Sequence, residues 1–375
     1  MSKTLFTILI IVLAGYYIPS NAQFQEGSDL QTIISEFGNK IKKDVEDDNV
    51  KGSISAVIVK EDQIIWSGAY GSSDIDNKTK ADSTTIYRTG SISKSFTAFL
   101  MMQLVEEGTI KLNDPIEIYL PEIKELKGYS NSTRITFQHL ASHTSGLIRE
   151  PKLENAASGP MEDWEIKILQ SIPKTSFKSK PGEHFSYSNI GFGILGFALS
   201  RAANKSFIEL VEEKIFKPLN MSSSFFIVPE DKMVDLAKGM RYQSIGEINS
   251  QSKLEHVGRG YKVPNGGIYL TPNDLAKFIV SNMGRMEILT QKNLSTMQSN
   301  QTPDGNYGLG FFLYQDGSIS TVGHGGSVAG YNCSLLFEKE SQYGVILMRN
   351  YNLGNTDLNA SSFALIRKLK TLDSK

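Results

Sequence analysis

The sequence predicts a mixed α/β (α+β) fold, with an antiparallel β-sheet built from both chain ends, flanking helices and an inserted, mainly helical domain. Two short β-rich segments near the N-terminus, Ser53–Val59 and Gln63–Tyr70, are separated by three residues and predict a hairpin. Helical periodicity then occupies the middle of the chain, and short strand-like segments return after Tyr307. Because strands stand at both ends with helices between them, we expect one sheet that joins the two ends.

The individual elements follow from spacing and from cap residues. In the first helix apolar residues recur on one face, and the helix that begins at Thr271 has threonine as its cap and proline at its first position. The helices expected are Asp29–Val45, Ser95–Glu107 ended by Gly108, Asn189–Ala203, one starting at Thr271, and Asp357–Leu369. The later strands expected are Leu309–Tyr314, Ser318–Val322, Asn332–Phe337 and Tyr343–Arg349.

Composition excludes several classes of protein. The 375 residues are 40% hydrophobic and 21% charged, which is typical of a globular protein. The formal net charge is −1 and the lysines and arginines are spread along the chain, so we expect no nucleic-acid partner. The sole cysteine, Cys333, lies in a strand-like segment, which indicates a buried structural thiol.

The first 22 residues have the pattern of a secretory signal peptide. Lys3 precedes an apolar run from Leu5 to Ile18, and small residues at Ser20 and Ala22 fit a cleavage site after Ala22. The run is shorter than the roughly 20 residues that span a bilayer, so we expect cleavage, no stable membrane span afterwards, and a secreted or periplasmic protein. The expected organisation is a signal peptide over 1–22 and a hydrolase domain over 23–375. Within that domain we expect a sheet subdomain over about 23–90 and 305–375 and a helical subdomain over about 91–304.

The candidate nucleophile is Ser91, three residues before Lys94. Residues three apart on a helix are neighbours, and a lysine can act as a base when burial keeps it neutral. The residues after Lys94 are apolar nearly all round, which predicts such burial. Two further Ser-x-x-Lys tetrads, at Ser171–Lys174 and Ser250–Lys253, lack this context: a proline interrupts one, and the other is polar.

Two further segments carry candidate site residues. Tyr187 and Asn189 precede a glycine-rich apolar helix, and a phenol can pass a proton while an amide can orient a substrate. A second Tyr-Ser-Asn triplet, at 129–131, lies in a polar segment and is interpreted as a surface turn. The segment Gly323-His324-Gly325-Gly326-Ser327 could let a substrate lie alongside a strand, with the N–H groups of Ser327 and Ser91 forming an oxyanion hole. Taken alone, this last segment also fits a glycine-rich hairpin with an exposed histidine.

Together the three segments resemble the motifs of the serine β-lactamase and penicillin-binding protein superfamily, and most closely its class C β-lactamase, DD-peptidase and esterase branch. Leu112–Pro115 and His143–Leu147 also look like framework motifs of that branch. The resemblance implies that the nucleophile is Ser91, the base Lys94, the proton shuttle Tyr187, and the substrate-binding residues Asn189, His324, Gly325, Gly326 and Ser327. Dedicated class C β-lactamases have lysine where this chain has His324, whereas His-x-Gly is the form of DD-peptidases, D-amino-acid peptidases and esterases in the branch.

We therefore expect an exported serine acyl hydrolase that forms an acyl-enzyme on Ser91 and acts on a small-molecule or peptide acyl substrate without a cofactor. The alternatives are a penicillin-binding sensor or cell-wall binder without turnover, an acyltransferase, and a weak β-lactamase. His139 and His143 have the spacing of zinc ligands but lack the accompanying glutamate and a third ligand, so no metal is expected. The natural substrate and the oligomeric state stay open.

Overall fold

The computed structural model describes residues 21–242 and 244–373. Apart from its last two residues, the predicted signal peptide lies outside this part of the chain. None of the helices in the described part combines the length and the hydropathy that crossing a bilayer requires.

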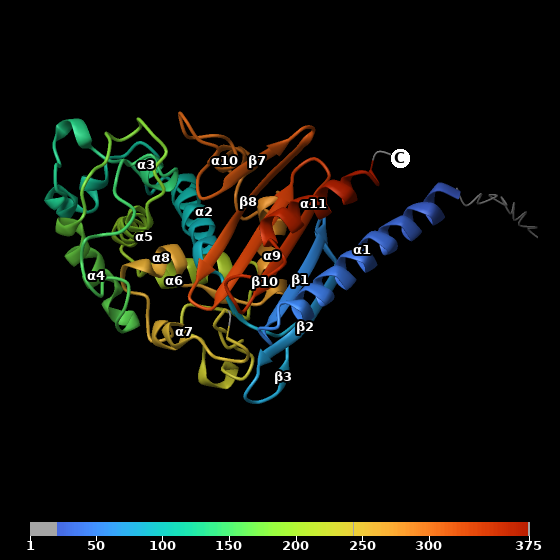
Figure 1. The fold of residues 1–375 in the computed structure, drawn as a ribbon. Coiled ribbons are helices and arrows are strands. Elements are labelled where there is room, and N and C mark those ends of the chain that lie inside the picture. The colour runs from blue at the N-terminus through green and yellow to red at the C-terminus, as the bar shows by residue number, and fades with distance from the viewer. Residues whose placement is uncertain (1–20, 243, 374–375) are drawn as a thin grey trace, which may run out of the picture.

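A seven-stranded antiparallel sheet joins the two ends of the chain, as predicted (Figure 1). Its strands occur in the order β3-β2-β1-β10-β9-β8-β7, so that β1 near the N-terminus pairs with β10 near the C-terminus. In this pairing Ile54 lies opposite Arg349. The strands are β1 (Ser53–Lys60), β2 (Gln63–Asp74), β3 (Thr79–Lys80), β7 (Phe312–Asp316), β8 (Ile319–Val328), β9 (Tyr331–Glu338) and β10 (Tyr343–Arg349).

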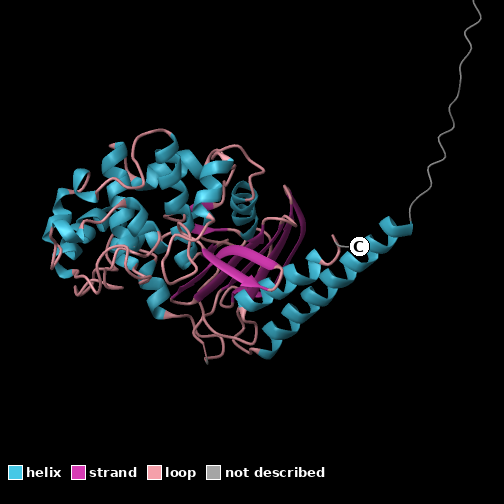
Figure 2. Ribbon diagram, turned by 90° about the horizontal axis from the view of Figure 1, so that it is seen from above, coloured by secondary structure: helices cyan, strands magenta, loops and turns pink. Residues whose placement is uncertain are grey.

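Helices cover both faces of this sheet (Figure 2). The terminal helices α1 (Asn21–Asp47) and α11 (Leu358–Lys370) pack on one face, and α9 (Pro272–Asn282) packs on the other. Successive side chains of a strand point to opposite faces. In β1, accordingly, Ile58 belongs to the apolar cluster under α1 and α11, whereas Val57 and Val59 belong to the larger cluster on the helical side.

The middle of the chain is mainly helical and lies to one side of the sheet (Figure 1). It also contains a small three-stranded sheet in the order β4-β6-β5. The helices are α2 (Ser93–Glu106), α3 (Phe137–Ala141), α4 (Trp164–Ser171), α5 (Asn189–Ala203), α6 (Phe207–Val211), α7 (Ser250–Glu255), α8 (Val263–Gly266) and α10 (Gln291–Met297). The short strands are β4 (Tyr87–Arg88), β5 (Ser224–Phe225) and β6 (Tyr269–Leu270).

Most of the sequence-based bounds agree with these elements to within a few residues, but the first helix and two of the later strands differ. Helix α1 begins at Asn21, well before the predicted start at Asp29. β7 begins at Phe312 because Gly310 adopts a positive φ of 75° and donates its N–H to Ala141, which keeps this part of the chain out of the sheet. β8 continues to Val328, so His324 lies within the strand and not at its end. The predicted subdomain boundaries stay predictions.

Candidate active site

The candidate nucleophile, Ser91, lies in a single 3₁₀ turn, Gly90–Ile92, which leads directly into α2. Gly90 has a φ of +53°, a left-handed conformation that favours glycine. Behind this turn the residues of α2 are buried without interruption from Ser93 to Leu104. A helix that is apolar nearly all round lies in the core, and this places whatever follows Ser91 away from water.

Lys94 lies in this buried environment, directly beside Ser91. Its side chain is 0% exposed, and its Nζ lies 3.0 Å from Ser91 Oγ and 3.2 Å from the backbone oxygen of Asn265. The rings of Tyr187 and Phe192 face the amine with centroids at 4.9 and 5.7 Å. Burial holds the pKa of Lys94 well below its usual value of 10.5, and the nearby Arg149 lowers it further. A neutral amine next to a hydroxyl can accept its proton.

The lysines of the two other Ser-x-x-Lys tetrads are placed differently. Lys174 follows the end of α4 and Lys253 lies in α7, and both are exposed. Neither lysine lies in a buried environment like that of Lys94. Burial therefore separates the first tetrad from the other two, as the sequence predicts.

Tyr187 is hydrogen-bonded to the Ser91 side chain. Burial raises the pKa of Tyr187 to about 12, although Arg149, whose guanidinium carbon lies 5.0 Å from the ring centroid, acts in the opposite direction. The phenol is therefore neutral at ordinary pH. It can relay a proton as a hydrogen-bond donor and acceptor, while Lys94 has the lower pKa that a base requires.

Asn189 is the first residue of α5, which Ser188 caps by accepting the N–H of Gly191. The Asn189 side-chain Nδ2 donates to Glu150 at 2.6 Å. Its backbone oxygen accepts from Asn265 Nδ2 at 2.9 Å. The cap of α5 and these two contacts together fix the asparagine close to the groups that surround Lys94.

Strand β8 brings its glycine-rich segment against the nucleophile turn. Its pairing with β7 ends at Gly323, while pairing with β9 continues to Val328, so β7 leaves residues 324–328 uncovered on one edge. The same segment contacts the turn closely through one face of the strand: a Cβ on Gly326 would lie 1.9 Å from Thr89 O, and a Cβ on Gly90 would lie 2.8 Å from Ser327 N. The backbone nitrogens of Ser91 and Ser327 therefore lie at the same contact between the turn and β8, where the oxyanion hole is expected.

His324 is buried in this strand and fully engaged by neighbours. Its Nδ1 lies 2.6 Å from Gly325 O and its Nε2 lies 3.1 Å from the hydroxyl of Tyr307. Burial lowers the pKa of His324 to about 3, and the Lys94 charge acts in the same direction. The imidazole is thus neutral, with Nδ1–H donating to the carbonyl and Nε2 accepting from the phenol. The structure excludes the exposed histidine of the alternative hairpin interpretation.

Several residues of the site escaped the sequence interpretation. Arg149 and Glu150 lie just after the His143–Leu147 motif, separated from it by Ile148. The motif marks this region of the chain but does not indicate the roles of these two side chains. Asn265 belongs to a short helix that no periodicity marks, and nothing in the sequence around Tyr307 indicates its contact with His324. His143, assigned to the framework, lies against Tyr187 with the ring centroids 4.1 Å apart and the rings tilted by 35°, and its Nδ1 accepts the N–H of Ser188.

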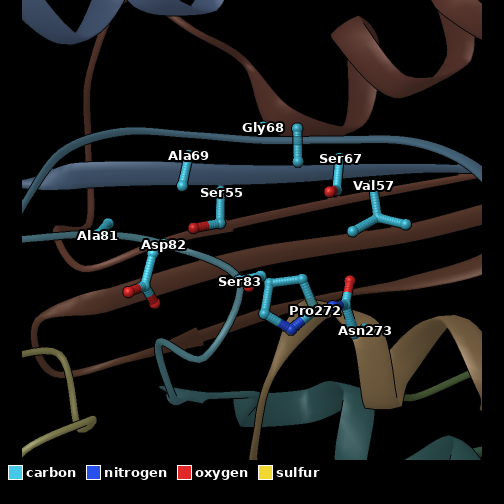
Figure 3. Close-up of a pocket in the computed structure, with 11 residues that line it drawn as sticks. Ser55, Val57, Ser67, Gly68, Ala69, Ala81, Asp82, Ser83, Pro272 and Asn273 are labelled. Carbon is cyan, nitrogen blue, oxygen red and sulfur yellow. The ribbon is translucent and has the colours of Figure 1, made fainter.

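A separate pocket of about 250 Å³ contains none of the predicted site residues (Figure 3). It lies between β1, β2 and the start of α9, and its lining includes Ser55 and Asp82. Ser55 is hydrogen-bonded to the hydroxyl of Tyr87, and Asp82 accepts from the backbone and hydroxyl of Thr84. The structure thus ties both groups to neighbours of their own. Within the described part of the chain, no cluster of three His, Cys, Asp or Glu side chains could hold a metal ion.

An antiparallel sheet joined by both chain ends, a helical region beside it, and a serine–lysine pair at the start of a buried helix define the serine β-lactamase and penicillin-binding protein fold. The chain belongs to the beta-lactamase family, whose model matches residues 38–366. This superfamily consists generally of serine hydrolases.

Known proteins agree with this assignment. Beta-lactamase-like protein 2 of Dictyostelium discoideum is 30% identical over 86% of this chain and 60% of its own length. Protein flp of Staphylococcus aureus strain N315 is 26% identical over 85% of this chain and 64% of its own length. The chain thus spans less than two thirds of each of these two curated relatives. The octameric penicillin-binding protein homologue from Pyrococcus abyssi has a similar fold, with a TM-score of 0.72 and 23% identity over 90% of this chain and 77% of its own.

Proposed function

We propose that the protein is an exported serine acyl hydrolase that forms a covalent acyl-enzyme on Ser91. The observation that carries the proposal is the 3.0 Å distance between Lys94 Nζ and Ser91 Oγ, with the lysine fully buried and its pKa lowered. A serine becomes an effective nucleophile when such a base removes its proton. The proposal of export rests on the signal-like N-terminal segment.

The proposed reaction has two stages. Lys94 takes the proton of Ser91 while Oγ bonds to the substrate carbonyl carbon, and the N–H groups of Ser91 and Ser327 stabilise the oxyanion. The proton passes through the neutral Tyr187 to the leaving amine or alcohol as its bond to the carbonyl carbon breaks. A water molecule then loses its proton to the same base and attacks the ester, which releases the acid and restores the Ser91 hydroxyl.

Strand β8 supports a peptide-like substrate. The edge of residues 324–328 that β7 leaves uncovered could pair with an extended chain, and the glycines at 325 and 326 leave space beside it. His324 supplies no positive charge on this strand, since its pKa is lowered to about 3. We therefore propose a DD-peptidase, D-amino-acid peptidase or esterase activity in preference to efficient hydrolysis of anionic β-lactams.

Intact-mass analysis tests this proposal. Incubation with a fluorophosphonate or a fluorescent penicillin should add one adduct, located on Ser91 by peptide mapping, and Ser91→Ala should abolish it. An adduct on another residue, or full turnover by the Ser91→Ala variant, would refute the assignment.

A substrate panel then separates the remaining possibilities. It should contain D-Ala-D-Ala peptides, nitrocefin and short nitrophenyl esters. Stable acylation without release would identify a sensor or binder, and products formed with an added amine would identify an acyltransferase. Rapid nitrocefin hydrolysis would contradict the preference for peptides and esters.

A further inference from the structure

Glu150 fixes the orientation of the Asn189 amide. Its Oε1 accepts from Asn189 Nδ2 at 2.6 Å, and its Oε2 lies 3.3 Å from the Lys262 amine. If the amide had the opposite orientation, Asn189 Oδ1 would face the Glu150 carboxylate at this short distance. Both oxygens are acceptors, so they would repel each other. The nitrogen of the amide must therefore point to Glu150 and the oxygen must point away from it.

This orientation leaves Asn189 Oδ1 as a buried acceptor without a hydrogen-bond partner within the described residues. An unpaired buried oxygen is costly, and such an atom often has a functional reason. Lys94 lies close to the same groups: Asn265 accepts from Lys94 with its backbone oxygen and donates to the Asn189 backbone with its side chain. In its protonated form Lys94 carries three N–H groups, whereas its contacts with Ser91 and Asn265 account for two.

We infer that Glu150 is a positioning residue that holds Asn189 Oδ1 ready to accept a hydrogen bond from the ammonium that Lys94 becomes when it takes the Ser91 proton. The inference rests on the proposed function and deepens it. In this step the proton moves from Ser91 Oγ to Lys94 Nζ as Oγ bonds to the substrate carbon. Glu150 touches neither the substrate nor the reacting atoms, and it acts through the amide of Asn189.

The charges around Lys94 make this inference testable by pH. Glu150 raises the pKa of Lys94, whereas three cations lower it. Arg149, Lys262 and Arg259 act on Lys94 by their positive charge, and Glu150 acts by its negative charge. The titratable rings of Tyr187, His143 and His324 lie close by. Among these groups Glu150 alone is a carboxylic acid. Lys262, its ion-pair partner, has the opposite effect on the same amine.

Two variants, Glu150→Gln and Lys262→Met, provide a matched comparison because each breaks the Glu150–Lys262 ion pair. In Glu150→Gln the Asn189 amide is no longer held in one orientation, because a glutamine can hydrogen-bond with either its oxygen or its nitrogen. The rate of Ser91 acylation should fall about 10–100-fold with little change in KM, as expected when a polar contact made in the transition state is lost. The acid limb of kcat/KM should move to lower pH, because losing the negative charge lowers the pKa of Lys94.

Lys262→Met leaves the carboxylate on Asn189, so its acylation rate should stay within about 3-fold of wild type. Its acid limb should move to higher pH, because a cation that lowers the Lys94 pKa is removed. Glu150→Asp keeps the charge but shortens the reach to the amide, so it should slow acylation while leaving the acid limb in place. All variants are compared in the full-length protein with the same nitrophenyl ester, and melting temperatures verify that each is folded.

An unchanged acylation rate in Glu150→Gln would overturn the inference. Equal rate losses in Glu150→Gln and Lys262→Met, with pH limbs that move together, would show that the ion pair acts as a structural brace. Should Glu150→Gln not fold, an acylation rate at the wild-type level in Glu150→Asp would overturn the inference as well. Failure of the proposed function is distinguishable, because wild-type protein would then form no adduct on Ser91 at all.

Discussion

A single methyl group at Gly326 should separate the two halves of the oxyanion hole. The Cβ of Gly326→Ala would lie 1.9 Å from Thr89 O and 3.3 Å from Ser91 N, and both atoms belong to the backbone of the nucleophile turn. Contacts of a Cβ below 3.0 Å essentially do not occur in proteins. Strand β8 must therefore move away from the turn by about 1 Å or more, a displacement that costs about 10²-fold in rate when it affects reacting groups.

The expected loss agrees with a second consideration. Removing one donor from an oxyanion hole costs about 10²–10³-fold, or roughly 2.7–4 kcal/mol of transition-state stabilisation. The assay is the rate of Ser91 acylation by a fluorophosphonate, followed by intact mass, together with a thermal melt.

Gly325→Ala, at the adjacent residue of the strand, is the matched comparison. Its Cβ would meet only the side chain of Asn359 in α11, at 3.0 Å or more. The nucleophile turn should therefore stay in place in this variant, which should lose much less of its acylation rate than Gly326→Ala. A folded Gly326→Ala protein that acylates as fast as wild type would refute the assignment of the Ser327 N–H to the oxyanion hole.

Three further outcomes are expected. Lys94→Met should slow Ser91 acylation by about 10²–10⁴-fold, which is the usual contribution of a general base. The melting temperature should not fall, because methionine fills similar space without burying an amine. A rate loss under 10-fold would exclude Lys94 as the base. Arg149→Gln should move the acid limb of kcat/KM to higher pH, because Arg149 lowers the Lys94 pKa and the enzyme needs the neutral amine; a shift to lower pH would contradict this sign. Tyr307→Phe should lower the free energy of unfolding, measured in urea, by about 1–3 kcal/mol, because it leaves the buried His324 Nε2 without its hydrogen-bond donor. The control is Tyr314→Phe, whose hydroxyl makes no hydrogen bond within the described residues, and it should change this free energy by less than about 0.5 kcal/mol.

The sequence predicts those parts of the fold that local patterns determine. The interactions that form these two helices are local in sequence: Thr271 caps the helix that follows it, and the apolar run after Asn189 lies in the helix that it forms. The bounds of α5 and β10 were therefore predicted correctly. The start of β7 was not, because it depends on a hydrogen bond between Gly310 and the distant Ala141.

The same distinction holds at the candidate site. Ser91 and Lys94 are three residues apart, and the burial that lowers the lysine pKa is visible in the apolar residues that follow. The contacts of Asn189 with Glu150 and of Lys94 with Asn265 join separate parts of the chain, and nothing in their local sequence marks them. Short-range chemistry was therefore predictable, whereas the surrounding hydrogen-bond network required the fold.

The pairing of β1 with β10 has a consequence for folding during synthesis on the ribosome. When the ribosome has made the chain only as far as Glu338, the edge of β1 that pairs with β10 has no partner strand. The apolar side chains that α11 covers in the folded protein are then exposed to water. Contacts between such distant segments form slowly, and an unpaired strand edge attracts other chains. The sheet can close only after β10 has been made, so the growing polypeptide needs protection from aggregation until this strand has emerged.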